Sequence, residues 1–186
     1  MSRKLPKSGE LLISKPSILD DSQFSRSIIL LAEYNTADGA VGFILNRESK
    51  YVINDLIPDI KSNHPVFFGG PVSTGNLYFV HRVPKLIPDS VKITENIYWG
   101  GSFKEITNLL NDNLLSKTDI RFFLGYSGWS RGQLLHELKE KSWLVKPNLF
   151  NNILDVDVSS FWKNEILKLG DSYKIWANAP KNPRLN

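Results

Sequence analysis

The stretch from residue 27 to residue 45, SIILLAEYNTADGAVGFIL, decides how this chain begins to fold. It opens with an almost continuously apolar, β-rich run over residues 27–34, which is typical of a buried strand. The turn signal Thr36–Gly39 follows, and its Asp-Gly pair tolerates the positive φ angles of a tight turn. A second apolar run covers residues 40–45. The sequence therefore predicts a hairpin over residues 27–45 with a four-residue loop.

Further short strands and three helices are predicted on either side of this hairpin. The strand candidates cover residues 9–14, 65–68, 77–83, 91–94, 97–99 and 120–124. The helices are expected to begin after Ser102, after Ser130 and after Ser159 or Ser160. The first two starts have the S-x-x-E/Q spacing of a capping box, and Gly170 suits a C-terminal cap of the third. Because strands and helices do not alternate regularly, we expect an α+β fold with a mostly antiparallel, curled sheet.

The composition indicates one ordinary globular domain. The chain has 186 residues, of which 41% are hydrophobic and 23% are charged. It contains no cysteine, which excludes disulfides, thiol catalysis and cysteine-bound metals. The longest apolar run, residues 28–32, is far shorter than the roughly 20 residues of a membrane span, and no signal peptide is recognisable. We therefore expect a cytoplasmic protein without a membrane partner.

The positive charge is concentrated in the two ends of the chain. The formal net charge is +4 and the isoelectric point is about 9.2. Residues 1–8 carry +3 and residues 171–186 carry +2, which leaves −1 for residues 9–170. We therefore divide the chain into a basic N-terminal tail (1–8), a single domain (9–170) and a C-terminal extension that is partly frayed (171–186). Because the domain has no basic face or helix, direct binding to nucleic acid is expected to be weak or absent.

Four stretches together resemble one family of bacterial proteins, the AlgH-like (YqgE-like) family. They are PSILDD (16–21) with FSRS (24–27), GAVGFILN (39–46), GGPV (69–72) with His81, and LGYSGW (124–129) through GQL (132–134) to Ser142-Trp143. The resemblance runs from about Gly9 to Gly170. It implies an α+β protein whose bifurcated sheet curls into a pseudo-barrel with about three helices. It also implies a link to transcriptional regulation, and it supplies no established set of catalytic residues.

Ser127 is the first candidate for chemistry. Gly125-Tyr126-Ser127-Gly128 follows an apolar strand and precedes a helix, which is the context of a nucleophile elbow, but Trp129 stands where that motif has glycine. No histidine is paired with Ser127 by the sequence, so the glycines are better explained by a tight turn that Trp129 anchors in the core. The same helix start, with Arg131 and Gln133, is also a candidate anion site, because helix N-termini offer free N–H groups. The structural alternative is that Ser130 and Gln133 form a capping box and already bond to those backbone N–H groups.

Two further candidates lie elsewhere in the chain. Gly69-Gly70-Pro71 is either a sharp turn or a loop that lets the backbone approach a ligand. Asp20 and Asp21 with Arg26 are interpreted as a turn cap and an ion pair rather than as a Mg²⁺ site. No dinucleotide or phosphate-loop motif is present, and the three histidines lack metal-ligand spacing, so the sequence predicts no cofactor and no metal.

The sequence therefore favours a non-enzymatic regulatory or binding protein whose partner is another protein or a small ligand. Its candidate contact residues are Asp20, Arg26, Gly69, Gly70, Pro71, His81, Ser127, Gly128, Trp129, Arg131 and Gln133. The alternative is an enzyme or small-ligand binder that uses the Gly69–Val72 and Gly125–Gly132 loops as one cleft. That alternative requires the two loops to meet around a concave pocket.

Overall fold

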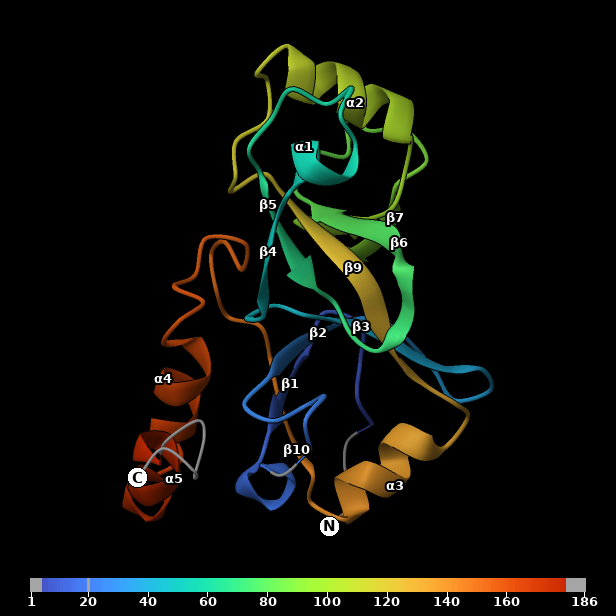
Figure 1. The fold of residues 1–186 in the computed structure, drawn as a ribbon. Coiled ribbons are helices and arrows are strands. Elements are labelled where there is room, and N and C mark those ends of the chain that lie inside the picture. The colour runs from blue at the N-terminus through green and yellow to red at the C-terminus, as the bar shows by residue number, and fades with distance from the viewer. Residues whose placement is uncertain (1–4, 20, 180–186) are drawn as a thin grey trace.

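The structure is a computed structural model that describes residues 5–19 and 21–179. Its strands are β1 (Leu11–Ser14), β2 (Ile28–Asn35), β3 (Gly39–Ile44), β4 (Glu48–Val52), β5 (Pro65–Phe68), β6 (Val72–His81), β7 (Val91–Thr94), β8 (Ile97–Trp99), β9 (Ile120–Trp129) and β10 (Trp143–Lys146) (Figure 1). Its helices are α1 (Ile53–Leu56), α2 (Phe103–Asn111), α3 (Gln133–Lys139), α4 (Phe161–Leu167) and α5 (Lys174–Asn178), with short 3-10 helices at Pro16–Ile18 and Asp171–Tyr173. The fold is α+β, as predicted.

The strands form one mostly antiparallel sheet that branches at β9. Its main path runs β10-β1-β2-β3-β9-β6-β8-β7. Residues 127–129 of β9 pair with β3, residues 122–124 pair in parallel with β5, and β5 continues to β4. Within the described residues the end strands β10 and β7 do not pair with each other, so the sheet stays open and the predicted closure into a pseudo-barrel is not confirmed.

The predicted hairpin is confirmed as β2 and β3. Its turn is held by Asn35, whose side-chain oxygen accepts from the Ala37 N–H at 2.8 Å and whose amide donates to Asp38 at 2.7 Å. The register shifts between Leu31 and Glu33, which is the signature of a β-bulge. The bulge changes which residues of β2 lie opposite β3 and places Glu33 across from Val41.

The long strand β9 divides the hydrophobic core. Because successive side chains on a strand point to opposite faces, Phe122 packs on the side of α1 and α2, and Phe123 packs on the other side against Phe43. The rings of Phe43 and Phe123 are stacked with centroids 5.0 Å apart. A third cluster joins Trp129 at the end of β9 to β1, β2, β10 and α3. The termini of β9 therefore lie in two different parts of the molecule.

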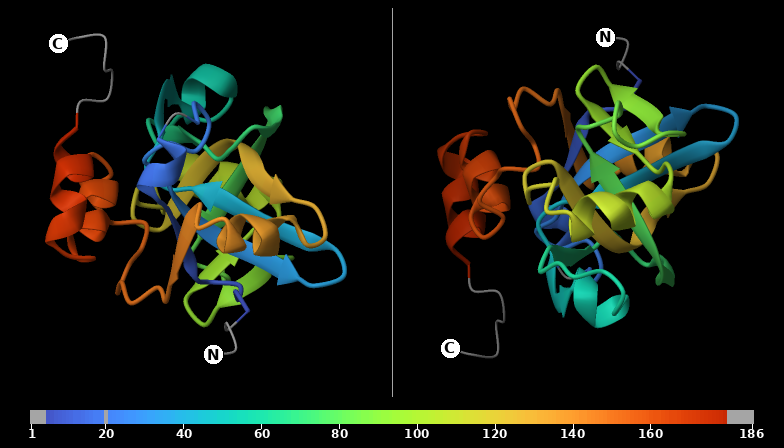
Figure 2. Two further views of the ribbon diagram at one scale, coloured as in Figure 1. Left: turned by 90° about the horizontal axis from the view of Figure 1, so that it is seen from below. Right: turned by 90° about the horizontal axis from the view of Figure 1, so that it is seen from above.

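The C-terminal helices α4 and α5 lie side by side on one flank of the sheet (Figure 2). Trp162 of α4 donates from its indole to the Ser14 carbonyl at 2.8 Å. The segment before α4 is fixed by Arg121, whose buried guanidinium donates to the Leu154 carbonyl at 2.6 Å and to the Leu45 carbonyl at 2.8 Å. Burial lowers the pKa of Arg121 to about 10, so the group remains a cation at neutral pH.

The helices differ from the prediction in number and in capping. The described residues contain five α-helices, whereas about three were predicted. The two additional helices, α1 and α5, have only four and five residues, so the sequence shows no helical periodicity there. Only the Ser102 half of the predicted capping box of α2 forms: the Ser102 hydroxyl accepts from the Glu105 N–H at 3.4 Å, while the Ser102 N–H donates to the Pro88 carbonyl at 2.9 Å. Ser160 occupies the N-cap of α4, but its hydroxyl donates to Asp157 instead of accepting a backbone N–H. Residues 180–186 of the predicted C-terminal extension lie outside the described residues.

Candidate functional site

The two glycine-rich segments that the sequence singled out meet in the structure. The Gly69 N–H donates to the Leu124 carbonyl at 2.8 Å, and the Gly69 carbonyl accepts from the Ile44 N–H at 2.9 Å. A Cβ at Gly70 would lie 2.3 Å from the carbonyl carbon of Tyr126, and Gly70 has a φ of 152°. The glycines are therefore required by direct backbone contact. We call this contact between residues 69–71 and 124–127 the glycine junction; Pro71 is exposed at its edge.

Ser127 belongs to this junction and does not form a nucleophile elbow. The strand was expected to end at Gly125, but β9 continues through it to Trp129. Ser127 is fully buried in mid-strand, and its hydroxyl donates to the Gly69 carbonyl at 3.0 Å. The predicted strand-to-helix turn at this position is wrong, because pairing with β3 and β6 keeps the segment extended.

A concave pocket adjoins the glycine junction. It has a volume of about 400 Å³. We call it the hairpin cleft, and it is lined by Glu33, Asp38, Gly39, Ala40, Val41, Val72, Tyr126, Gly128, Trp129 and Ser130. Of the two predicted loops, Val72 and residues from 126 to 130 contribute to the lining of this pocket, whereas Gly69, Gly70 and Pro71 do not.

The floor of the hairpin cleft follows from the register of three strands. Glu33 of β2 lies opposite Val41 of β3, and Val41 lies opposite Gly128 of β9. A Cβ at Gly128 would be 3.0 Å from the Tyr126 ring and 3.4 Å from Val72. The Tyr126 ring therefore packs directly over Gly128, and both residues line the cleft.

The hairpin cleft carries negative charge. Glu33 and Asp38 are both exposed, and no lysine or arginine is among the residues that line the cleft. Asp38 accepts from Asn35, while no hydrogen bond or ion pair to the Glu33 side chain is found in the described part of the chain. Two carboxylates beside a tyrosine ring attract a cation.

Trp129 and Gln133 hold α3 to the sheet, and Trp129 also lines the hairpin cleft. Trp129 is buried, and its indole donates to Glu137 at 2.8 Å; the indole of Trp143 donates to the same carboxylate oxygen at 2.7 Å. Gln133 donates to the other oxygen at 3.0 Å. The N-cap of α3 is Gly132 with a φ of 76°, and only the Gln133 half of the predicted capping box forms, with the Ser130 N–H at 3.0 Å.

Arg26 and His81 lie away from the hairpin cleft. The Arg26 guanidinium lies over the Trp162 ring, 5.6 Å from its centroid, and donates to the Ala179 carbonyl at 2.6 Å. His81 is fully buried beside Ser90 and the Gly100 carbonyl, and burial lowers its pKa to about 4. Asp20 lies outside the described residues, and Asp21 caps a turn by accepting from the Phe24 N–H at 3.0 Å.

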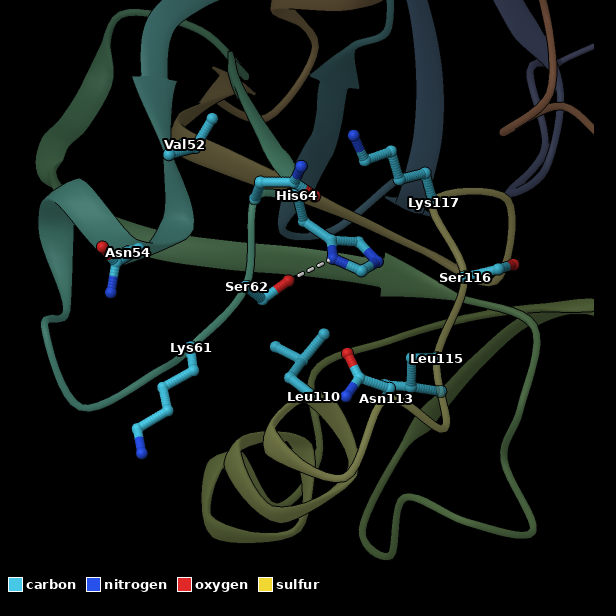
Figure 3. A pocket seen from close by; sticks show the side chains of 11 residues that line it. Val52, Asn54, Lys61, Ser62, His64, Leu110, Asn113, Leu115, Ser116 and Lys117 are labelled. Carbon is cyan, nitrogen blue, oxygen red and sulfur yellow. Dashed lines mark hydrogen bonds between the residues drawn. The ribbon is translucent and has the colours of Figure 1, made fainter.

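Sequence reasoning missed a second pocket, which forms around His64 (Figure 3). We call it the His64 pocket, and it is lined by Val52, Asn54, Lys61, Ser62, Asn63, His64, Leu110, Asn113, Leu115, Ser116 and Lys117. These residues come from three separate stretches of the chain, so no local motif predicts the pocket. The one local signal is the Ser62-x-His64 spacing, in which the serine hydroxyl lies 2.6 Å from the imidazole.

Two general features concern metals and membranes. The described residues contain no group of three or more histidine, aspartate or glutamate side chains that could hold a metal ion. Across residues 5–19 and 21–179, none of the helices has the length and apolar character needed to cross a membrane.

Comparisons with known proteins agree with this architecture. The family model described as AlgH-like (DUF179) matches residues 11–174. A UPF0301 protein from Parabacteroides distasonis is 38% identical over 185 residues, which are 98% of this chain and 92% of that protein. A UPF0301 protein from Cytophaga hutchinsonii is also 38% identical, over 96% of this chain and 98% of that one.

Solved structures show the same fold at lower sequence identity. The solution structure of the AlgH protein from Pseudomonas aeruginosa has a TM-score of 0.72 and 22% identity, and covers 97% of this chain and 99% of that one. A crystal structure of a protein from Corynebacterium diphtheriae also has a TM-score of 0.72, with 20% identity over 96% of this chain and 95% of that one. The match of the family model to nearly the whole chain, together with these relatives, shows that the protein belongs to the AlgH-like family.

Proposed function

We propose that this protein acts by binding, not by catalysis, and that the hairpin cleft receives a cationic side chain of a protein partner. One observation carries the proposal: Glu33 and Asp38 line a cleft that contains no basic side chain. The ring of Tyr126 on the adjoining wall adds an aromatic surface for an ammonium or guanidinium group.

The magnitude of the attraction favours a protein partner over a free amine. An exposed ion pair contributes about 0.2–1 kcal/mol, and a cation over an exposed aromatic ring adds about 0.5–1 kcal/mol. Together these contributions correspond to millimolar affinity at best. A specific complex therefore needs further contact area around the cleft, which a folded partner supplies and a small amine does not.

The surroundings of the cleft support binding over catalysis or DNA contact. Ser127, the nucleophile candidate that the sequence suggested, is buried and hydrogen-bonded to Gly69. A cleft lined by Glu33 and Asp38 repels phosphate groups, and residues 9–170 carry a net charge of −1. A role in transcription would therefore depend on a protein partner and not on direct contact with DNA.

The proposal is tested by titrating the full-length protein with a capped tetra-arginine peptide and following backbone amides by NMR. We expect the amides of Gly39 and Gly128 to move saturably at low salt. The double variant Glu33→Gln/Asp38→Asn removes two charges and should weaken binding at least about fivefold. Gly128→Ala, at a position whose φ is not left-handed, brings a methyl group to 3.0 Å from the Tyr126 ring; the ring must shift, which should also weaken binding, and thermal unfolding checks that the fold persists.

The matched control is Asp112→Asn/Glu140→Gln, which removes two exposed carboxylates elsewhere. Equal weakening in this control would show a general charge effect and contradict the proposal. Turnover of an ester, phosphate or nucleotide that disappears in Ser127→Ala would contradict the non-enzymatic assignment.

A further inference from the structure

The His64 pocket lies at the opposite end of β9 from the hairpin cleft. It has a volume of about 780 Å³ and is built from the β4–α1 junction, the loop before β5 and the segment that leads from α2 to β9. The strand β9 begins at Ile120, just after this pocket, and ends at Trp129 beside the hairpin cleft. A ten-residue strand spans roughly 30 Å, so the two sites are separate.

The lining of the His64 pocket has the opposite charge to that of the hairpin cleft. Lys61 and Lys117 are exposed lining residues, and no carboxylate is among the lining residues. Two nearby aspartates are engaged elsewhere: Asp55 accepts from the Val52 N–H at 2.9 Å, and Asp119 accepts from the Ser116 hydroxyl at 2.6 Å. Their carboxylates therefore hold the backbone of the pocket walls and do not line its interior.

The imidazole of His64 lies in the wall of this pocket. The residue is 6% exposed, and its buried Nε2 makes no hydrogen bond of regular geometry within the described residues, although the Ser116 backbone acts on the ring. Burial lowers the pKa of His64, so the ring is neutral at neutral pH. The Ser62 hydroxyl lies 2.6 Å from Nδ1, and Nε2 points toward Ser116 (Figure 3). With Ser62 as donor to Nδ1, the ring proton resides on Nε2, which is then a donor.

The walls of the pocket are fixed by hydrogen bonds between its segments. Asn111 of α2 accepts from the Lys61 N–H at 2.7 Å and donates to the Asp59 carbonyl at 3.1 Å. Asn54 donates to the Ile60 carbonyl at 2.8 Å, and the Ile53 N–H donates to the His64 carbonyl at 2.9 Å. A site whose backbone is already ordered loses little conformational entropy when a ligand binds.

We propose that the His64 pocket binds a small, multiply charged oxyanion. Lys117 and Lys61 supply positive charge at the rim of the pocket, and the His64 imidazole lies in its wall, so a bound anion changes the environment of the ring. The side-chain amide of Asn113, which lies below the imidazole in Figure 3, is a further donor. Phosphate and clustered carboxylate groups share this chemistry. This site is independent of the hairpin cleft and of the function proposed for it.

The experiment is a titration of the full-length protein with inorganic pyrophosphate and, separately, with citrate. The ring signals of His64, His81 and His136 are followed by NMR and assigned through His64→Gln and His136→Gln variants. We expect saturable movement of the His64 signals by at least one of the two anions, while those of the buried His81 and the exposed His136 stay in place. The anion that saturates at lower concentration identifies the ligand as a phosphate or a polycarboxylate.

Charge variants make the outcome specific. Lys61→Gln/Lys117→Gln should weaken binding at least about tenfold, because two cations facing a multiply charged anion are removed. The control Lys85→Gln/Lys139→Gln removes two exposed lysines elsewhere and should change affinity less than about twofold. All four lysines are exposed, so folding is expected to persist and is checked by thermal unfolding. Equal weakening in both double variants, or no saturable response of His64 to either anion, would overturn the proposal.

Discussion

At the scale of single residues, His81 is the group whose burial most clearly makes the stability of the fold depend on pH. Its Nε2 faces the Gly100 carbonyl at 3.2 Å and the Ser90 hydroxyl at 2.9 Å, and its Nδ1 accepts from the Val83 N–H at 3.3 Å. Every ring nitrogen is thus satisfied in the neutral form. The prediction that His81 contributes to a binding surface is not supported by this burial, and we assign it a structural role.

We predict that His81 makes the fold less stable in acid. Burial lowers its pKa from 6.5 to about 4 in the folded protein, so the unfolded chain binds the proton more readily. The contribution of neutral His81 to the free energy of unfolding is complete above pH 6.5. About 3 kcal/mol of this free energy is lost as the pH falls toward 4. Urea unfolding between pH 7 and pH 4.5 measures this loss.

The variant His81→Gln isolates the effect of that side chain. It is expected to be less stable at pH 7 but to show a flatter dependence of unfolding free energy on pH. His136→Gln, which changes an exposed histidine, should keep the slope of the natural sequence. If His81→Gln also keeps that slope, another group is responsible.

At the scale of elements, α3 is held to the sheet by one carboxylate. Glu137 accepts two indole N–H groups, from Trp129 of β9 and Trp143 of β10, and also the amide of Gln133. The Phe24 ring packs against both indoles, with centroids 6.2 Å and 5.5 Å away. A helix of seven residues has little stability of its own, so this carboxylate fixes its position.

We predict that Glu137→Ala lowers the free energy of unfolding by about 2–3 kcal/mol, because two buried indole N–H groups lose their acceptor. Tryptophan emission should shift to longer wavelength as water reaches those rings. The neighbouring variant Glu140→Ala, at an exposed position, should change stability by no more than about 0.5 kcal/mol. Unchanged stability and emission in Glu137→Ala would mean that the packing with Phe24 suffices.

At the scale of the whole molecule, charge is divided between the ends of the chain and the two pockets. The ends are basic by sequence, the hairpin cleft is acidic and the His64 pocket is basic. The separation of opposite charges along β9 favours different ligands at the two sites.

We predict that DNA binding by the full chain is weak and depends on the basic ends. Fluorescence anisotropy of a random duplex, measured at several salt concentrations, should detect binding only at low salt. A full-length variant with glutamine at five basic positions should lose that binding; the positions are Arg3, Lys4, Lys7, Lys181 and Arg184. Retained binding with a steep salt dependence in this variant would show that the folded body contacts DNA.

Elements whose signals are local could be predicted from the amino-acid sequence. The hairpin of β2 and β3, the cap at Ser102 and the short strand at residues 65–68 were all predicted, because alternation, turn residues and capping spacing act over a few residues. The sequence also shows the charge distribution and the resemblance to the AlgH-like family, which the comparisons confirm. The short helices α1 and α5 were not predicted, because four or five residues are too few to show the helical period of 3.6 residues.

Which side chains are buried, and which segments share a site, depends on long-range packing that the sequence patterns do not show. The sequence predicted that a strand ends at Gly125. In the structure β9 continues beyond it, because β3 and β6, which are distant in the chain, supply its hydrogen bonds. Ser127 was a disfavoured candidate nucleophile in a predicted turn, and the same pairing places it in mid-strand and buries it against Gly69. The His64 pocket joins three distant stretches, and no local preference encodes such long-range contact. Local dihedral preferences act within one turn or strand, whereas pockets arise from the packing of elements that meet only after folding.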